Sequence, residues 1–144
     1  MDRLTLYGSF TSSSSYKPML YLALARLPFS FRTINLKTGV QKSPEYLAVN
    51  RWGVVPSLRH RGLTILQSNV ILDYLARETG HFEGRIEQEC WQAREWLSWE
   101  ADHITYLAKV RHSARFRPSH PETIAEFRPR AEAALSFVDK TVEN

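Results

Sequence analysis

The chain has 144 residues, of which 43% are hydrophobic and 24% are charged. This composition is typical of a globular protein and excludes an intrinsically disordered chain. The longest apolar run, residues 19–25, is far too short to span a membrane, so we expect no membrane partner. Because Cys90 is the single cysteine, an internal disulfide framework and a cysteine-rich metal site are excluded, and we expect a cytoplasmic protein without bound metal.

The net charge of +4 is unevenly distributed along the chain. Residues 1–80 carry 10 Lys and Arg against 4 Asp and Glu, whereas residues 81–144 carry 9 against 11. The ordinary interpretation is solvated surface charge, and the alternative is that the first part attracts a small anion. Since the basic residues are dispersed and accompany no recognised nucleic-acid motif, we expect no nucleic-acid partner.

The first part of the chain predicts alternating strands and helices. Residues 4–7 alternate in hydropathy as a strand does, and the apolar segment 19–27 predicts a helix packed on a sheet. Between them lies the serine-rich segment 8–18, which is either a flexible tether or a turn that forms a site. Residues 29–36 predict a second strand.

A short helix, a hairpin and a longer helix complete this part. The short helix is predicted over residues 43–50, with Ser43 as cap and Pro44 at the first position. The hairpin is predicted over residues 56–60 and 63–66, which flank Arg61-Gly62. The longer helix is predicted from Ser68 as cap to the residue before Gly80. The order strand, helix, strand, short helix, hairpin, helix indicates an α/β domain over residues 1–80.

The second part, residues 85–144, predicts helices alone. Apolar residues recur at spacings of three and four from Arg85 to Lys109, which indicates one long helix. Residues 117–121 break the pattern, and residues 122–142 predict a second helix, in which Pro129 argues against one straight helix. Cys90 lies on the apolar stripe of the long helix, so we expect a core residue there and not a nucleophile.

Four motifs in chain order resemble the glutathione transferases, in particular the bacterial members and the zeta class. They are Tyr7-Gly8-Ser9 with Ser12 and Ser15-Tyr16-Lys17; residues 42–50 with Gly53, Val55 and Pro56; residues 67–75; and residues 96–100. The resemblance implies an α/β thioredoxin-like N-terminal domain, followed by an all-α C-terminal domain that is incomplete. It also implies a homodimer.

The resemblance gives the serine-rich segment a chemical role. It implies that Ser12 donates a hydrogen bond to the glutathione thiolate, with Ser15 as a further glutathione contact. Ser15 and Ser13 remain alternative donors, and Ser12 can instead complete a turn while Ser15 caps the helix. No cysteine occupies this segment, so a protein-cysteine redox cycle in it is excluded.

Further glutathione contacts follow from the same resemblance. Val55 would pair through its backbone with the cysteinyl residue of glutathione if the bond to Pro56 is cis, the alternative being a trans proline that starts an edge strand. Gln67 and Ser68 would hold the γ-glutamyl end, or merely cap the helix. Lys42 would approach the glycine carboxylate, or be ordinary surface charge.

The implied activity is transfer of glutathione, as co-substrate, to a small hydrophobic electrophile. Two alternatives stay open. One is a non-catalytic binding or interaction protein with the same fold, and the other is a glutathione-dependent isomerase or dehalogenase.

Overall fold

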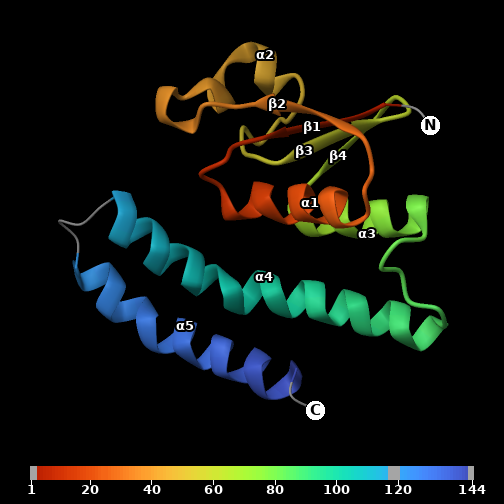
Figure 1. Cartoon of the computed structure of the whole chain (residues 1–144). Coiled ribbons are helices and arrows are strands. Elements are labelled where there is room, and N and C mark those ends of the chain that lie inside the picture. The colour runs from red at the N-terminus through yellow and green to blue at the C-terminus, as the bar shows by residue number, and fades with distance from the viewer. Residues whose placement is uncertain (1–2, 117–120, 143–144) are drawn as a thin grey trace. The chain divides into compact units, whose positions relative to one another are not determined.

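The computed structural model describes residues 3–116 and 121–142. The chain divides into two compact units, Met1–Glu83 and Gly84–Asn144 (Figure 1).

The first unit contains a four-stranded sheet in the order β2-β1-β3-β4. Its strands are β1 (Leu4–Gly8), β2 (Phe29–Thr33), β3 (Ser57–His60) and β4 (Leu63–Leu66). β1 runs parallel to β2 and antiparallel to β3, and β3 and β4 form the predicted hairpin. All four predicted strands are confirmed, although β2 ends three residues before its predicted end at residue 36.

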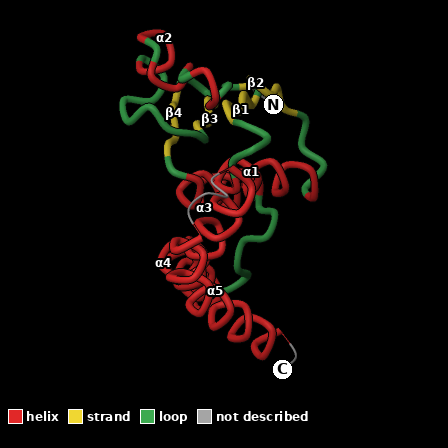
Figure 2. Tube along the Cα trace, turned by 90° about the vertical axis from the view of Figure 1, so that its left-hand side faces the viewer, coloured by secondary structure: helices red, strands yellow, loops and turns green. Residues whose placement is uncertain are grey.

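Helices α1 (Ser13–Leu24) and α3 (Ser68–Thr79) lie together on one side of this sheet, and α2 (Pro44–Leu47) lies on the other (Figure 1, Figure 2). The core between the helices and the sheet is aliphatic. Its fully buried members are Leu6, Leu22, Leu58, Ile71 and Leu75. Burying each such side chain contributes about 1.5–3 kcal/mol, so this core fixes where the strand ends and helix ends meet.

The first helix begins earlier than the sequence predicts. Ser13, not Met19, is its first residue, and it ends at Leu24. The reason is a cap, because Ser12 has an extended backbone and its Oγ accepts a hydrogen bond from the Ser15 N–H at 3.2 Å. Most of the serine run is therefore the first turn of a helix and not a flexible tether.

The connection from β2 to β3 contains two unpredicted 3-10 helices, η1 (Leu36–Thr38) and η2 (Val40–Lys42), before α2. The cap of α2 is confirmed: Pro44 is its first residue, and the Ser43 Oγ accepts from the Tyr46 N–H at 3.3 Å.

The second unit is a helical pair, α4 (Glu87–Phe116) and α5 (Pro121–Val142). Both predicted helices are confirmed, α4 extends beyond its predicted end at Lys109, and α5 continues past Pro129. Aromatic contacts join the two helices, with ring centroids 5.8 Å apart for Tyr106 and Phe127. The break between them was predicted over residues 117–121, of which residues 117–120 lie outside the described residues. Within the described ranges, no helix is both long enough and apolar enough to cross a membrane.

Candidate functional site

One row of paired residues crosses three strands of the sheet. Tyr7 of β1 pairs with Ser57 of β3, and Ser57 pairs with Leu66 of β4. The end of β1, the start of β3 and the end of β4 therefore meet at one edge of the sheet. Residues 9–12 follow the end of β1, residues 55–56 precede the start of β3, and residues 67–68 follow the end of β4. This edge of the sheet therefore gathers most of the predicted site residues.

The N-terminal halves of α1 and α3 are also tied together. The Lys17 Nζ donates a hydrogen bond to the Asn69 Oδ1 at 2.6 Å, although the two residues are 52 positions apart. Both helix N-termini thus lie on this side of the sheet, and each presents N–H groups and a positive dipole end. An anionic group is stabilised in such a place.

Ser12 is half-buried and stands immediately before the first residue of α1. Its hydroxyl oxygen accepts from the Ser15 N–H, and that interaction uses a lone pair and leaves the hydroxyl proton able to donate. Ser13, the alternative donor, is exposed. Ser12 therefore combines a fixed oxygen position with a proton for a ligand.

Ser15 has a different place. Its side chain is 0% exposed, and its Oγ accepts a hydrogen bond from the Ser9 N–H at 3.1 Å. The interpretation in which Ser15 caps the helix is wrong, because Ser12 is the cap. A buried side chain with this partner holds the loop. The contact of Ser15 with glutathione stays a prediction.

Gly8 lets the loop and helix approach the sheet so closely. A Cβ built on Gly8 would lie 3.0 Å from a ring carbon of Phe31 and 3.2 Å from the Cβ of Ser15. Any larger residue at this strand end would push the first turn of α1 away from the sheet.

The peptide bond between Val55 and Pro56 is cis, as the resemblance implied. Val55 is half-buried and Pro56 is buried. Among the described residues, the Val55 N–H and C=O have no hydrogen-bond partner. An extended peptide can satisfy both groups in the manner of an added strand.

A buried polar cluster holds the segment before Val55. The Tyr46 hydroxyl donates to the Val54 carbonyl oxygen at 2.8 Å, and the Asn50 Nδ2 donates to the same oxygen at 2.7 Å. Both side chains also contact the Ser57 Oγ, each at 3.1 Å. Burial raises the pKa of Tyr46, and hydrogen bonds with Ser57 and Asn50 partly oppose that rise.

Sequence reasoning assigned no role to Tyr46 or Asn50. The signal in the sequence was a pair of polar residues four positions apart within the helix predicted over residues 43–50. The helix itself ends at Leu47, so only Tyr46 lies in it. They are positioning residues for the loop that carries Val55.

Gln67 and Ser68 stand at the start of α3. Gln67 is exposed, has a φ of 70°, and makes no side-chain capping hydrogen bond. The prediction that Ser68 caps the helix is wrong, because Ser68 is the first helical residue and Gln67 occupies the cap position. A positive φ at a residue other than glycine costs about 1–3 kcal/mol and is typical of functional sites.

Lys42 is exposed and contacts the other side of the same loop. Its Nζ donates to the Trp52 carbonyl oxygen at 3.1 Å. A Cβ built on Gly53 would lie 2.9 Å from that Nζ, so the Lys42 side chain lies directly against Gly53. The ammonium group is thus held two residues from Val55 along the chain.

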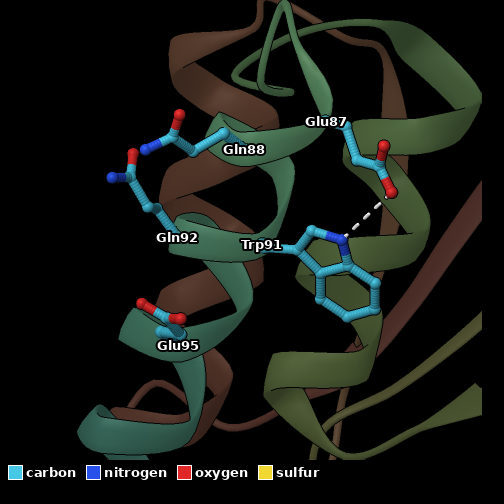
Figure 3. Close-up of a pocket in the computed structure, with 5 residues that line it drawn as sticks. All are labelled: Glu87, Gln88, Trp91, Gln92 and Glu95. Carbon is cyan, nitrogen blue, oxygen red and sulfur yellow. Dashed lines mark hydrogen bonds between the residues drawn. The ribbon is translucent and has the colours of Figure 1, made fainter.

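A separate hollow of about 430 Å³ lies on the second unit and contains none of the predicted site residues (Figure 3). It is lined by Glu87, Gln88, Trp91, Gln92 and Glu95, all from α4. The Trp91 Nε1 donates to the Glu87 Oε1 at 3.4 Å, which holds the indole against the helix (Figure 3). Cys90 is half-buried on the same helix, and its Sγ donates to the Gly84 carbonyl oxygen at 3.3 Å.

The described residues contain no group of three or more His, Cys, Asp or Glu arranged to hold a metal ion.

The first unit matches a known protein family. The family model of the glutathione S-transferase N-terminal domain matches residues 2–77. The chain is 38% identical over 82 residues to maleylacetoacetate isomerase maiA of Aspergillus fumigatus, covering 54% of this chain and 36% of that protein. It is 34% identical over 104 residues to glutathione S-transferase F10 of Arabidopsis thaliana, covering 68% of this chain and 47% of that protein.

Among solved structures, a possible glutathione S-transferase from Rhodopseudomonas palustris is similar, with a TM-score of 0.89 and 25% identity. The match covers 98% of this chain and 66% of that one. The chain spans less than half the length of the two curated relatives. The predicted fold, a thioredoxin-like domain followed by a helical region, is confirmed. The chain belongs to the glutathione S-transferase family.

Proposed function

We propose that the first unit binds glutathione at the sheet edge and activates its thiol for reaction with a small electrophile. The observation that carries this proposal is the row Tyr7–Ser57–Leu66, which supports a single site formed by Ser12, Val55 and Ser68. The chemistry of these groups fits the peptide. Val55 offers an unpartnered backbone N–H and C=O, α3 offers a helix N-terminus for a carboxylate, and Ser12 offers a hydroxyl proton.

The chemical task is to ionise the thiol. A cysteinyl thiol has a pKa of about 8.5, so it is mostly protonated at neutral pH. A hydrogen bond to a charged acceptor contributes about 1.5–3 kcal/mol, and a helix N-terminus contributes about 0.3–1 kcal/mol. Ser12 and the start of α1 supply these two effects together, which is enough to make the thiolate the main form.

The remaining contacts orient the peptide. Ser68, half-buried at the start of α3, holds the γ-glutamyl carboxylate, and Gln67 accepts from the amino group beside it. Lys42 pairs with the glycine carboxylate from its position against Gly53. Pro56 holds Val55 in place, and Ser15 holds the loop by accepting from the Ser9 N–H.

Two assays test the proposal. Isothermal titration with glutathione reports binding, and conjugation of a chloronitrobenzene reports transfer. Binding with turnover supports the transferase, and binding without turnover supports the non-catalytic alternative. The absence of binding at millimolar glutathione would contradict both.

The second candidate reaction is a glutathione-dependent isomerisation. The observation that favours it is the 38% identity to maleylacetoacetate isomerase maiA over 82 residues. Addition of the thiolate to a carbon–carbon double bond, rotation about the resulting single bond and elimination of the thiolate would need the same activated thiol. Conversion of maleylacetoacetate, which is the cis isomer, into its trans isomer in the presence of the chain and glutathione tests this reaction.

We further propose that the chain forms a homodimer. The supporting observation is exposed aromatic surface on α4, where Trp91 is 56% and Trp96 is 40% exposed. Sedimentation velocity measures the assembly directly, and a monomer at micromolar concentration would contradict the proposal.

A further inference from the structure

Lys17 is the only charged residue of α1 (Ser13–Leu24). It is half-buried, and its Nζ donates a hydrogen bond to the Asn69 Oδ1 at 2.6 Å. Asn69 is the second residue of α3 and directly follows Ser68. Side chains on a helix lean toward the helix N-terminus, so the Lys17 ammonium group lies near the starts of both helices.

A second contact between α1 and α3 holds the other end of α3. Tyr21 lies four residues after Lys17, so both side chains stand on one face of α1. The Tyr21 hydroxyl oxygen lies 3.0 Å from the Oγ1 of Thr79, the last residue of α3. α1 therefore holds α3 at both ends, and Lys17 holds the end that carries Ser68.

The helix starts beside Lys17 carry no negative side chain of their own. In the described helices α1 and α3, neither first turn contains an acidic residue, and the first acid of α3, Asp73, lies one turn beyond Asn69. The N–H groups at each helix start add the positive end of a dipole. A cation at such a place opposes the helix dipoles, whereas a bound anion compensates both. The arrangement of charges thus favours a carboxylate.

We propose that Lys17 is a positioning residue for the γ-glutamyl carboxylate of glutathione, an inference that rests on the proposed glutathione site. Through Asn69, Lys17 fixes the first turn of α3, where Ser68 meets this carboxylate. The ammonium group also attracts the carboxylate over several Å, because a partly buried place screens charge less than water does.

Isothermal titration with two peptides tests the proposal. The first is glutathione, and the second is γ-aminobutyryl-cysteinylglycine, which lacks only the γ-glutamyl carboxylate. Lys17→Met removes the charge but keeps the stem of the side chain. It should weaken binding of glutathione by about fivefold to tenfold and binding of the second peptide by less than about twofold.

Two further variants accompany Lys17→Met. Lys17→Arg keeps the charge and should bind glutathione within about threefold of the original chain. Lys37→Met is the matched control at an exposed lysine of η1, and it should leave the affinities for both peptides unchanged.

Asn69→Asp separates the positioning of the ligand from the stability of the helices. Aspartate keeps an oxygen acceptor for Lys17 and adds a negative charge to the first turn of α3, which stabilises a helix. The free energy of unfolding in urea should therefore rise. Glutathione binding should weaken by about tenfold or more, because two carboxylates would then share one place.

Three results would each overturn this proposal alone, because the original chain would still bind glutathione. They are equal glutathione affinity in Lys17→Met and the original chain, equal losses for the two peptides in folded Lys17→Met, and full glutathione affinity in Asn69→Asp. The absence of glutathione binding by the original chain would overturn the proposed function and this proposal together.

Discussion

The side-chain amide of Asn50 donates to the carbonyl oxygen of Val54 at 2.7 Å, and Asn50 is completely buried. The same Nδ2 reaches the Ser57 Oγ at 3.1 Å, while the Asn50 Oδ1 accepts from the Trp52 N–H at 3.0 Å. One side chain thus connects both sides of the loop that carries Val55. These hydrogen bonds hold the loop in place without a ligand.

We expect Asn50→Ala to lower the free energy of unfolding by about 1–3 kcal/mol, because buried groups lose their partners. Glutathione affinity should fall with it, since Val54 and Val55 would no longer be held. Asn35→Ala is the matched control, because Asn35 is exposed and caps only η1. Urea unfolding and calorimetric titration measure the two effects. Equal stability of Asn50→Ala and the original chain would contradict this account of the loop.

Substitutions at Gly53 and Gly39 separate the cost of backbone strain from the cost of steric crowding. Both have positive φ, 58° and 75°, but a Cβ on Gly53 would lie 2.7 Å from the Gln41 carbonyl oxygen, whereas a Cβ on Gly39 meets nothing within 4 Å. Gly39→Ala should cost about 1–2 kcal/mol of stability. Gly53→Ala should cost more and should weaken glutathione binding, because it displaces Lys42. Equal costs in urea unfolding would show that neither the Gln41 carbonyl oxygen nor the Lys42 side chain crowds Gly53.

Gln67→Gly should separate stability from binding. Since Gln67 has a φ of 70°, glycine relieves strain and should raise the free energy of unfolding by about 1 kcal/mol. Glutathione affinity should nevertheless fall severalfold, because the side chain that meets the amino group is lost. Arg26→Gly, at a φ of 53°, is the control that relieves strain elsewhere and leaves affinity unchanged. Unchanged affinity in Gln67→Gly would remove Gln67 from the site.

Tyr46 makes the free energy of unfolding depend on pH in the alkaline range. Burial raises its pKa in the folded chain, so both states keep the proton below the ordinary tyrosine pKa of about 10. Above that pH the unfolded chain ionises first, and stability falls as the pH rises through the folded pKa. Burial likewise raises the pKa of Tyr21 and Tyr74, which share the effect.

We therefore expect Tyr46→Phe to reduce the loss of stability between about pH 9 and about pH 11. Urea unfolding at several pH values in this range measures it. Tyr16→Phe is the matched control, because Tyr16 is 59% exposed. An identical loss in the original chain and Tyr46→Phe would mean that Tyr46 is not held in a buried environment.

Several features were predictable because neighbouring residues determine them. Ser43 before Pro44 caps a helix whatever surrounds it, and Arg61-Gly62 between two apolar runs forms a hairpin. The cis bond before Pro56 is different, since chain propensity alone favours trans. It was predictable only from the family motif around it.

Other features depend on contacts between segments, which the sequence pattern does not reveal. The serines of residues 12–15 have little helix propensity, yet Ser12 caps α1 and Ser15 is buried against the Ser9 N–H. Asn50 and Tyr46 acquire their role from the Val54 carbonyl oxygen, which only the folded loop brings within reach.

The thiol pKa of bound glutathione tests the central claim most directly. Spectrophotometric titration of the thiolate should give a pKa below the ordinary value of about 8.5 in the original chain. Ser12→Ala should raise it by about 1–2, Ser12→Thr should restore it because threonine keeps the hydroxyl, and Ser15→Ala should leave it unchanged. An unchanged pKa in Ser12→Ala, together with a raised one in Ser15→Ala or Ser13→Ala, would contradict the account and assign the donor to another serine.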